Sequence, residues 1–143
     1  MARVSSRINQ QGFSLVEILL AVAVFALFVT AVVGGIIYGR ESTALAGQRQ
    51  RAVKLADECQ EAVRGIRDGS YSNITNGTFG LALSAGHWTL SGSSDLTDIF
   101  TRSATIADGL TNQKVITCNV NWAQNLQRNG SIQTVSYLSL IHI

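Results

Sequence analysis

GFSLVEILLAVAVFALFVTAVVGGIIY, residues 12–38, is the stretch that decides the fold of this chain. Its segment 18–38 has no charged residue, and as a helix it would measure roughly 31 Å, about the hydrocarbon thickness of a bilayer. Arg3 and Arg7 precede the segment, and no comparable basic cluster follows until Arg49. This charge distribution predicts a cytoplasmic N-terminus, one membrane-spanning helix and an extracytoplasmic remainder.

Two ordinary explanations of this segment leave a feature unexplained. A cleaved secretory signal has a shorter apolar core followed by an Ala-x-Ala site, whereas here Ala21-Val22-Ala23 lies inside the run. A signal anchor fits the length and the charges but not Glu17, because a carboxylate costs on the order of 2–3 kcal/mol or more towards the bilayer centre. Glu17 therefore either lies at the membrane surface or pairs with a cation from another chain.

Gly12-Phe13-Ser14-Leu15-Val16-Glu17 resembles the cleavage and methylation motif of type IV prepilins and of the pseudopilins of type II secretion. A glycine precedes the scissile bond, an aromatic residue follows it, and the glutamate is fifth after it. The resemblance implies that prepilin peptidase cleaves after Gly12 on the cytoplasmic side and that Phe13 is N-methylated. It also implies that Glu17 neutralises the new Phe13 amine of an adjacent subunit, since a buried charge needs a partner.

A helical pattern continues beyond the membrane segment. Asp68-Gly69-Ser70 predicts its end, with Gly69 suited to a C-terminal cap. Gly34 and Gly35 interrupt it, and each weakens a helix by about 1 kcal/mol relative to alanine. They either let the helix loosen during assembly or permit close packing between membrane helices. Apolar residues at three- and four-residue steps predict one buried stripe: Ala52, Leu55, Ala56, Cys59, Val63 and Ile66.

After Gly69 the composition changes to glycine, serine, threonine and asparagine with short alternating runs. In one run Ile116, Cys118, Val120 and Trp122 alternate with polar residues, which predicts a strand of an antiparallel sheet with one buried face. Asp108-Gly109, Asn112-Gln113 and Asn129-Gly130 predict turns. The candidate strands are 78–83, 87–91, 99–106, 115–122 and 132–140.

A long N-terminal helix followed by an antiparallel sheet predicts an α+β fold, and the resemblance implies the pilin fold. We expect a leader (1–12), a transmembrane and assembly half of the helix (13–39), an amphipathic half (40–68) and a sheet module (69–143).

The end of the chain, 139–143, is apolar without a turn or cap. It fits either an edge strand or a truncated gene end. The order of several residues also resembles the globular part of minor pilins: Tyr71, Phe79-Gly80, Trp88, Phe100-Thr101-Arg102, Trp122 and Tyr137-Leu138.

Cys59 lies on the helix stripe and Cys118 on the apolar strand face, so both are expected at the same interface. The extracytoplasmic side permits a disulfide between them. Two buried free cysteines are the alternative, and two cysteines are too few for a disulfide framework.

The composition favours neither catalysis nor nucleic-acid binding. Without Arg3 and Arg7 the 11 basic residues fall to nine, which equals the nine acidic ones. His87 and His142 lack metal-ligand spacing, and no Gly-x-Ser-x-Gly or phosphate-loop motif occurs. We therefore expect no enzyme, cofactor, metal or nucleic-acid partner.

The resemblance implies a structural subunit of a type IV pilus or a secretion pseudopilus. Its expected partners are the prepilin peptidase and methyltransferase, other pilin subunits and the inner-membrane assembly machinery. It would span the inner membrane once and then enter a filament at the cell surface. One alternative is a bitopic, signal-anchored membrane protein that presents a small extracytoplasmic binding module. A second is a tip adhesin or a DNA-capturing minor pilin, although no basic or aromatic patch for such a role is visible in the sequence.

Overall fold

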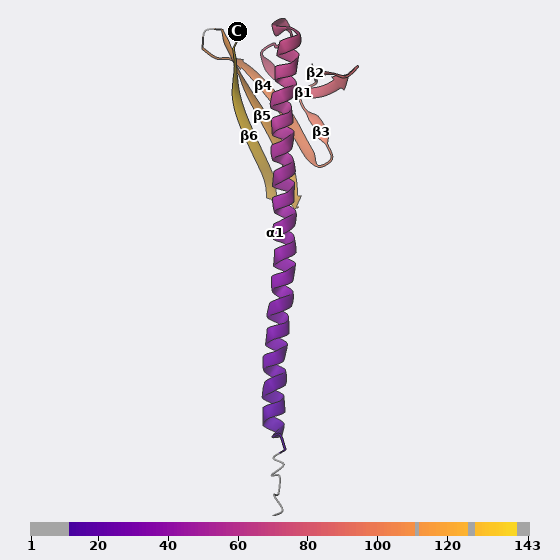
Figure 1. Cartoon of the computed structure of the whole chain (residues 1–143), viewed down its shortest axis with the longest axis vertical. Coiled ribbons are helices and arrows are strands. Elements are labelled where there is room, and N and C mark those ends of the chain that lie inside the picture. The colour runs from indigo at the N-terminus through magenta and orange to yellow at the C-terminus, as the bar shows by residue number, and fades with distance from the viewer. Residues whose placement is uncertain (1–11, 111, 126–127, 140–143) are drawn as a thin grey trace, which may run out of the picture. The chain divides into compact units, whose positions relative to one another are not determined.

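The computed structural model describes residues 12–110, 112–125 and 128–139 (Figure 1). The expected leader, apart from Gly12, and residues 140–143 lie outside this range. One helix, α1, runs from Leu15 to Gly69. The chain divides into two compact units, with the boundary between Ser42 and Thr43, so α1 contributes to both.

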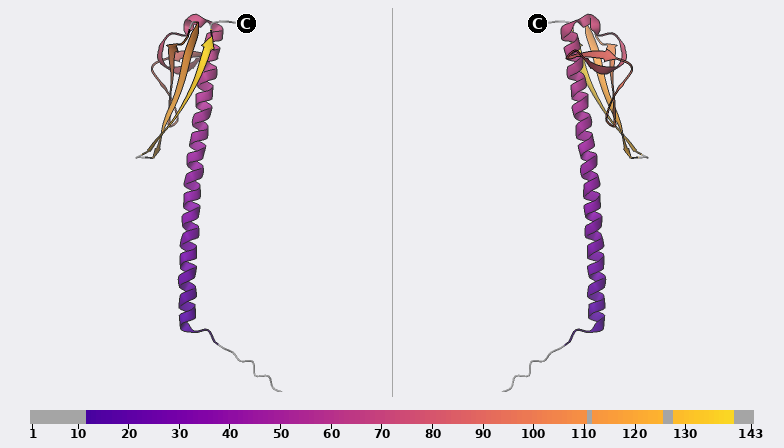
Figure 2. Two further views of the ribbon diagram at one scale, coloured as in Figure 1. Left: turned by 90° about the vertical axis from the view of Figure 1, so that its left-hand side faces the viewer. Right: turned by 90° about the vertical axis from the view of Figure 1, so that its right-hand side faces the viewer.

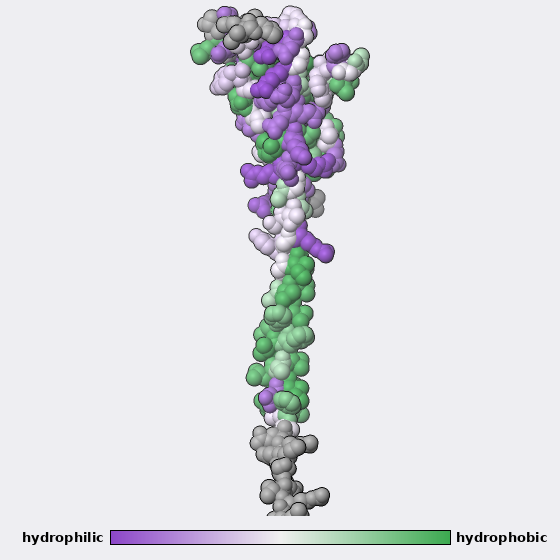
Figure 3. All heavy atoms as spheres, in the orientation of Figure 1, coloured by the Kyte–Doolittle hydropathy of each residue, from purple (hydrophilic) through white to green (hydrophobic). Residues whose placement is uncertain are grey.

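The described part of the first unit is mostly apolar helix, and no other described residue packs against it. Every residue from Gly12 to Ser42 is exposed, and the most apolar 18-residue window of α1 has a mean hydropathy of 2.8. Figure 3 shows most of this stretch as hydrophobic surface, with a hydrophilic patch near its start. The helix is long and apolar enough to cross a membrane. It continues through Gly34 and Gly35, and a Cβ added at either glycine would meet no atom within 4 Å.

The second unit consists of the rest of α1, a short 3₁₀ helix and a six-stranded antiparallel sheet. The main strand order is β2-β1-β4-β5-β6, and β3 pairs with the part of β4 that β1 leaves free. The later part of α1 lies on one face of this sheet (Figure 2), so the expected α+β arrangement is confirmed. The element bounds are η1 Tyr71–Asn73, β1 Gly77–Ser84, β2 His87–Ser91, β3 Asp95–Thr97, β4 Phe100–Asp108, β5 Gln113–Asn125 and β6 Arg128–Ser139.

The core forms between α1 and one face of the sheet, as the two apolar patterns predict. Five of the six stripe residues on α1 are buried, and Leu55 is half-buried. On the sheet, Ile106 and Ile116 are paired across β4 and β5 and are both buried. Small side chains on α1 let the helix approach the sheet closely: Ala52, Ala56 and Ala62 are all fully buried.

One strand was missed, and one expected turn was wrong. Strand β3, Asp95–Thr97, has no apolar alternation and was not predicted. Asn129-Gly130 does not form a turn but lies inside β6, which begins at Arg128. A Cβ on Gly130 would lie 2.3 Å from Cε2 of Trp122, so this position needs glycine to accommodate the indole ring. The predicted turn after Asp108 is present, with the Gly109 amide donating to the Gln113 carbonyl.

A disulfide joins α1 to β5. Cys59 and Cys118 are fully buried and bonded to each other, with their Cα atoms 6.2 Å apart. The bond closes a loop spanning 59 positions of sequence, and a cross-link of this kind typically contributes about 2–4 kcal/mol.

We expect the mass of the chain purified without reductant to rise by about 2 Da after reduction under denaturing conditions. The midpoint of thermal unfolding should fall in the Cys59→Ala/Cys118→Ala double variant, because the unfolded chain is then no longer constrained. An unchanged mass would show that the thiols are free in the purified protein.

A buried arginine links β4, β3 and α1. The Arg102 side chain is 4% exposed, and its Nη2 and Nε atoms lie 2.9 and 3.1 Å from Oδ2 of Asp95. Its Nη1 contacts Glu58 Oε1 at 3.3 Å and the Leu55 carbonyl at 3.4 Å. The guanidinium also lies 5.8 Å from the centroid of the Trp88 ring. Asp95 additionally accepts a hydrogen bond from the Leu81 amide, so Arg102 and Asp95 together hold the short β3 in place.

A second polar cluster joins the start of β1 to the β4–β5 turn. Lys114 Nζ lies 2.5 Å from Asp108 Oδ1 and 2.6 Å from Asn76 Oδ1, and Asn76 Nδ2 donates to Asp108 Oδ2. Hydrogen bonds from Lys114 and then from Asn76 lower the pKa of Asp108 from its ordinary value of 3.8.

Because the folded-state pKa of Asp108 is the lower one, the cluster stabilises the fold fully above the ordinary pKa of aspartate. This contribution is lost as pH falls below 3.8 through the folded-state value. We expect unfolding midpoints measured across this acidic range to decline less steeply for Asp108→Asn than for the parent. Asp57→Asn, an exposed α1 position, serves as the control, and identical slopes for Asp108→Asn and the parent would contradict the prediction.

Candidate functional site

The candidate site is the start of α1. Gly12, Phe13 and Ser14 lie outside the helix, and the Ser14 carbonyl accepts hydrogen bonds from the Glu17 amide at 3.0 Å and the Ile18 amide at 3.2 Å. Glu17 is therefore the third helical residue. A carboxylate in the first turn is favoured by the positive end of the helix dipole. The Ser14-x-x-Glu17 spacing is that of a capping box, a local signal that the sequence reasoning missed.

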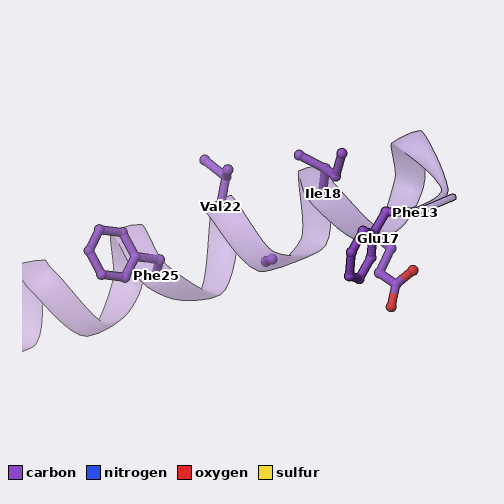
Figure 4. Close-up of a pocket in the computed structure, with 6 residues that line it drawn as sticks. Phe13, Glu17, Ile18, Val22 and Phe25 are labelled. Atoms are coloured by element: carbon purple, nitrogen blue, oxygen red, sulfur yellow. The ribbon is translucent and has the colours of Figure 1, made fainter.

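Phe13 and Glu17 lie next to each other at this helix start. In Figure 4 the Phe13 ring lies beside the Glu17 side chain, whose carboxylate points away from the helix. Phe13 is 80% exposed and Glu17 is exposed as well. Among the residues that the structure describes, no basic group lies within ion-pair distance of Glu17. The Glu17 carboxylate, at the start of the apolar part of α1, thus lacks a counter-charge within the described part of the chain.

The helix surface beside Glu17 is hollowed. One hollow is lined by Phe13, Glu17, Ile18, Ala21, Val22 and Phe25 (Figure 4). A second is lined by Glu17, Leu20, Ala21, Val24, Phe25 and Phe28. Both include the row Glu17, Ala21 and Phe25, in which the small Ala21 leaves a gap between two larger residues. Such gaps on a helix receive side chains of a neighbouring helix.

The other predicted site residues are placed as follows. Gly12 is exposed, and a Cβ there would meet no atom within 4 Å, so packing among the described residues does not require a glycine. Gly34 and Gly35 lie on the first unit of α1, and Cys59 and Cys118 lie in the core of the second unit. Among the described residues no group of three or more histidine, cysteine or acidic side chains could hold a metal ion.

The comparison with known families identifies the same segment. Residues 7–33 match the family model described as the prokaryotic N-terminal methylation motif. The match includes Gly12, Phe13 and Glu17 and most of the apolar run. No curated protein and no solved structure gives a significant match to the chain.

Proposed function

Because this chain carries the signature of type IV pilins and pseudopilins over residues 7–33, we propose that it is a filament subunit of a pilus or a secretion pseudopilus. Its precursor is anchored in the inner membrane by the apolar helix and is cleaved between Gly12 and Phe13 by prepilin peptidase. The observation that carries the proposal is the Glu17 carboxylate, exposed in the first turn of an apolar helix and placed beside Phe13.

Cleavage would supply the missing counter-charge. Hydrolysis of the Gly12–Phe13 bond releases the leader and leaves a protonated amine on Phe13, and N-methylation keeps this amine cationic. In a bilayer both the amine and the Glu17 carboxylate are poorly solvated. An amine on one subunit and a carboxylate on the next therefore attract each other strongly, and their pairing sets the axial register between subunits.

The rest of the first unit suits packing among like helices. The gap at Ala21 lies next to Glu17, so a side chain from the neighbouring helix can fill it when the two charges meet. Gly34 and Gly35 allow helix backbones to approach closely or the helix to loosen during extraction from the membrane. The exposed apolar surface would then be covered by other subunits instead of lipid.

The mature N-terminus tests the proposal directly. We expect mass spectrometry of the protein from its own cells to show a chain that begins at Phe13 and carries one methyl group. The uncleaved precursor should accumulate in cells that lack the prepilin peptidase. A mature chain that retains residues 1–12 in cells with an active peptidase would refute the proposal and favour a simple membrane anchor.

A further inference from the structure

The face of the sheet that points away from α1 has an unusual composition. We call it the outer face and define it by the alternate residues of 101–107 on β4, 115–121 on β5 and 131–137 on β6. Register across the three strands arranges these twelve positions as four rows of three. None of the twelve is charged, and eight are serine, threonine, asparagine or glutamine. None is buried, so no described residue covers the outer face.

The polar end of the outer face is a hollow. Thr101, Asn121 and Ser131 form one row, and all three line an open hollow of about 560 Å³ at the end of the sheet. The row presents two hydroxyls and an amide, each of which can donate and accept hydrogen bonds.

The next row adds further unpaired groups of the same kind. Ser103, Asn119 and Gln133 are aligned across the strands. Within the described residues, the amides of Asn119, Asn121 and Gln133 make no side-chain hydrogen bond. At the opposite end the outer face becomes apolar, with Tyr137 68% exposed and Val135 51% exposed beside the half-buried Val115.

This combination favours one class of partner by its chemistry. A surface without charge offers no counter-ions to nucleic acid or to anionic lipid. Packing two copies face to face would bury hydroxyls and amides without assured partners, which is costly. A neutral polysaccharide instead presents hydroxyls that match the amides and apolar C–H faces that match Tyr137 and the valines. Successive rows lie about 7 Å apart along the strands, and neighbouring strands lie about 4.8 Å apart. Several rows can therefore contact successive sugars of one polymer.

We propose that the outer face binds a neutral polysaccharide, with one sugar unit in the hollow over Thr101, Asn121 and Ser131. This inference rests on the second unit alone and does not depend on filament formation. Binding to a single sugar is weak, and several rows acting together give the polymer its affinity.

Co-sedimentation of the full-length chain in detergent micelles with amorphous cellulose and with starch granules tests the proposal. Polygalacturonate gel and DNA-coated beads serve as anionic comparisons. We expect at least one of the two neutral polymers to retain the parent chain and the anionic materials not to. The Asn121→Ala/Gln133→Ala double variant should bind at least tenfold more weakly. Asn73→Ala removes an exposed amide away from the outer face and should bind like the parent.

Thermal unfolding of each variant in the same micelles establishes that it is folded. Ser131→Asp provides a second test at one exposed position, because it places a charge in the hollow and should also weaken binding at least tenfold. Failure of both neutral polymers to retain the parent would overturn the proposal, and so would unchanged binding by folded variants. Self-association that the double variant abolishes would instead identify the outer face as a contact between copies of this chain.

Discussion

Replacing Glu17 with glutamine is expected to abolish filament assembly while leaving the precursor in the membrane and cleaved after Gly12. Glutamine keeps the size of the side chain and its ability to accept a hydrogen bond in the first turn of α1, so the helix should still begin at Leu15. The substitution removes only the charge. Breaking a poorly solvated ion pair costs about 3–5 kcal/mol, which corresponds to a loss of assembled filament of more than about 100-fold.

The measurement compares the filament fraction sheared from cells with the membrane fraction, by immunoblot and electron microscopy. Glu17→Asp keeps the charge on a shorter side chain and should restore part of the assembly. Glu41→Gln is the matched control, because it makes the same change at an exposed position of α1 beyond the apolar run. Normal filaments from the Glu17→Gln variant would show that the carboxylate serves only to start the helix.

The fold could be predicted largely from two short-range periodicities. The three- and four-residue steps on α1 and the two-residue alternation on β5 each identify a buried face, and two such faces in one small module have to pack together. The same reasoning placed Cys59 and Cys118 at one interface, where the structure joins them. Where the patterned residues are apolar, a local pattern thus predicts which surfaces pack together in the fold.

Polar contacts between distant segments could not be predicted in this way. Lys54 has the i,i+4 spacing for a helix-surface pair with Glu58, but Glu58 instead contacts Arg102 on β4. Strand β3 depends on the pairing of Asp95 with Arg102, and neither residue belongs to an apolar pattern. Gly130 has the sequence of a turn, yet its role is set by an indole ring on the neighbouring strand. The position of each of these residues is explained by a contact with a residue on another helix or strand, which no short-range pattern identifies.

The sequence assigns the candidate site to individual residues because its signal is an ordered motif, and the roles of these residues stay predictions. Gly12, Phe13 and Glu17 stand at fixed spacing, and the structure adds that Phe13 and Glu17 lie beside each other at the helix start. The counter-charge and the occupant of the gap at Ala21 lie beyond what one chain can reveal, because the proposed function assigns both to another subunit.

Replacing Arg102 with alanine is expected to destabilise the second unit by about 3–5 kcal/mol. Arg102 is 4% exposed and Asp95 is 18% exposed, so the substitution leaves a largely buried carboxylate without its bidentate partner. It also removes the contacts of the guanidinium with the Leu55 carbonyl and the Trp88 ring. Arg102→Lys keeps the charge but loses the planar two-point contact, so it should recover only part of the stability.

Urea unfolding of the oxidised full-length chain in micelles, followed by the fluorescence of Trp88 and Trp122, measures this loss. Arg51→Ala is the control, because Arg51 pairs with Asp98 while both side chains are more than half exposed, at 60% and 54%. A solvated pair of this kind contributes about 1 kcal/mol or less. If removing Arg102 costs no more than removing Arg51, burial does not strengthen the Arg102–Asp95 pair. In the expected case the difference between the two variants shows that one buried guanidinium holds β3 and α1 to the sheet.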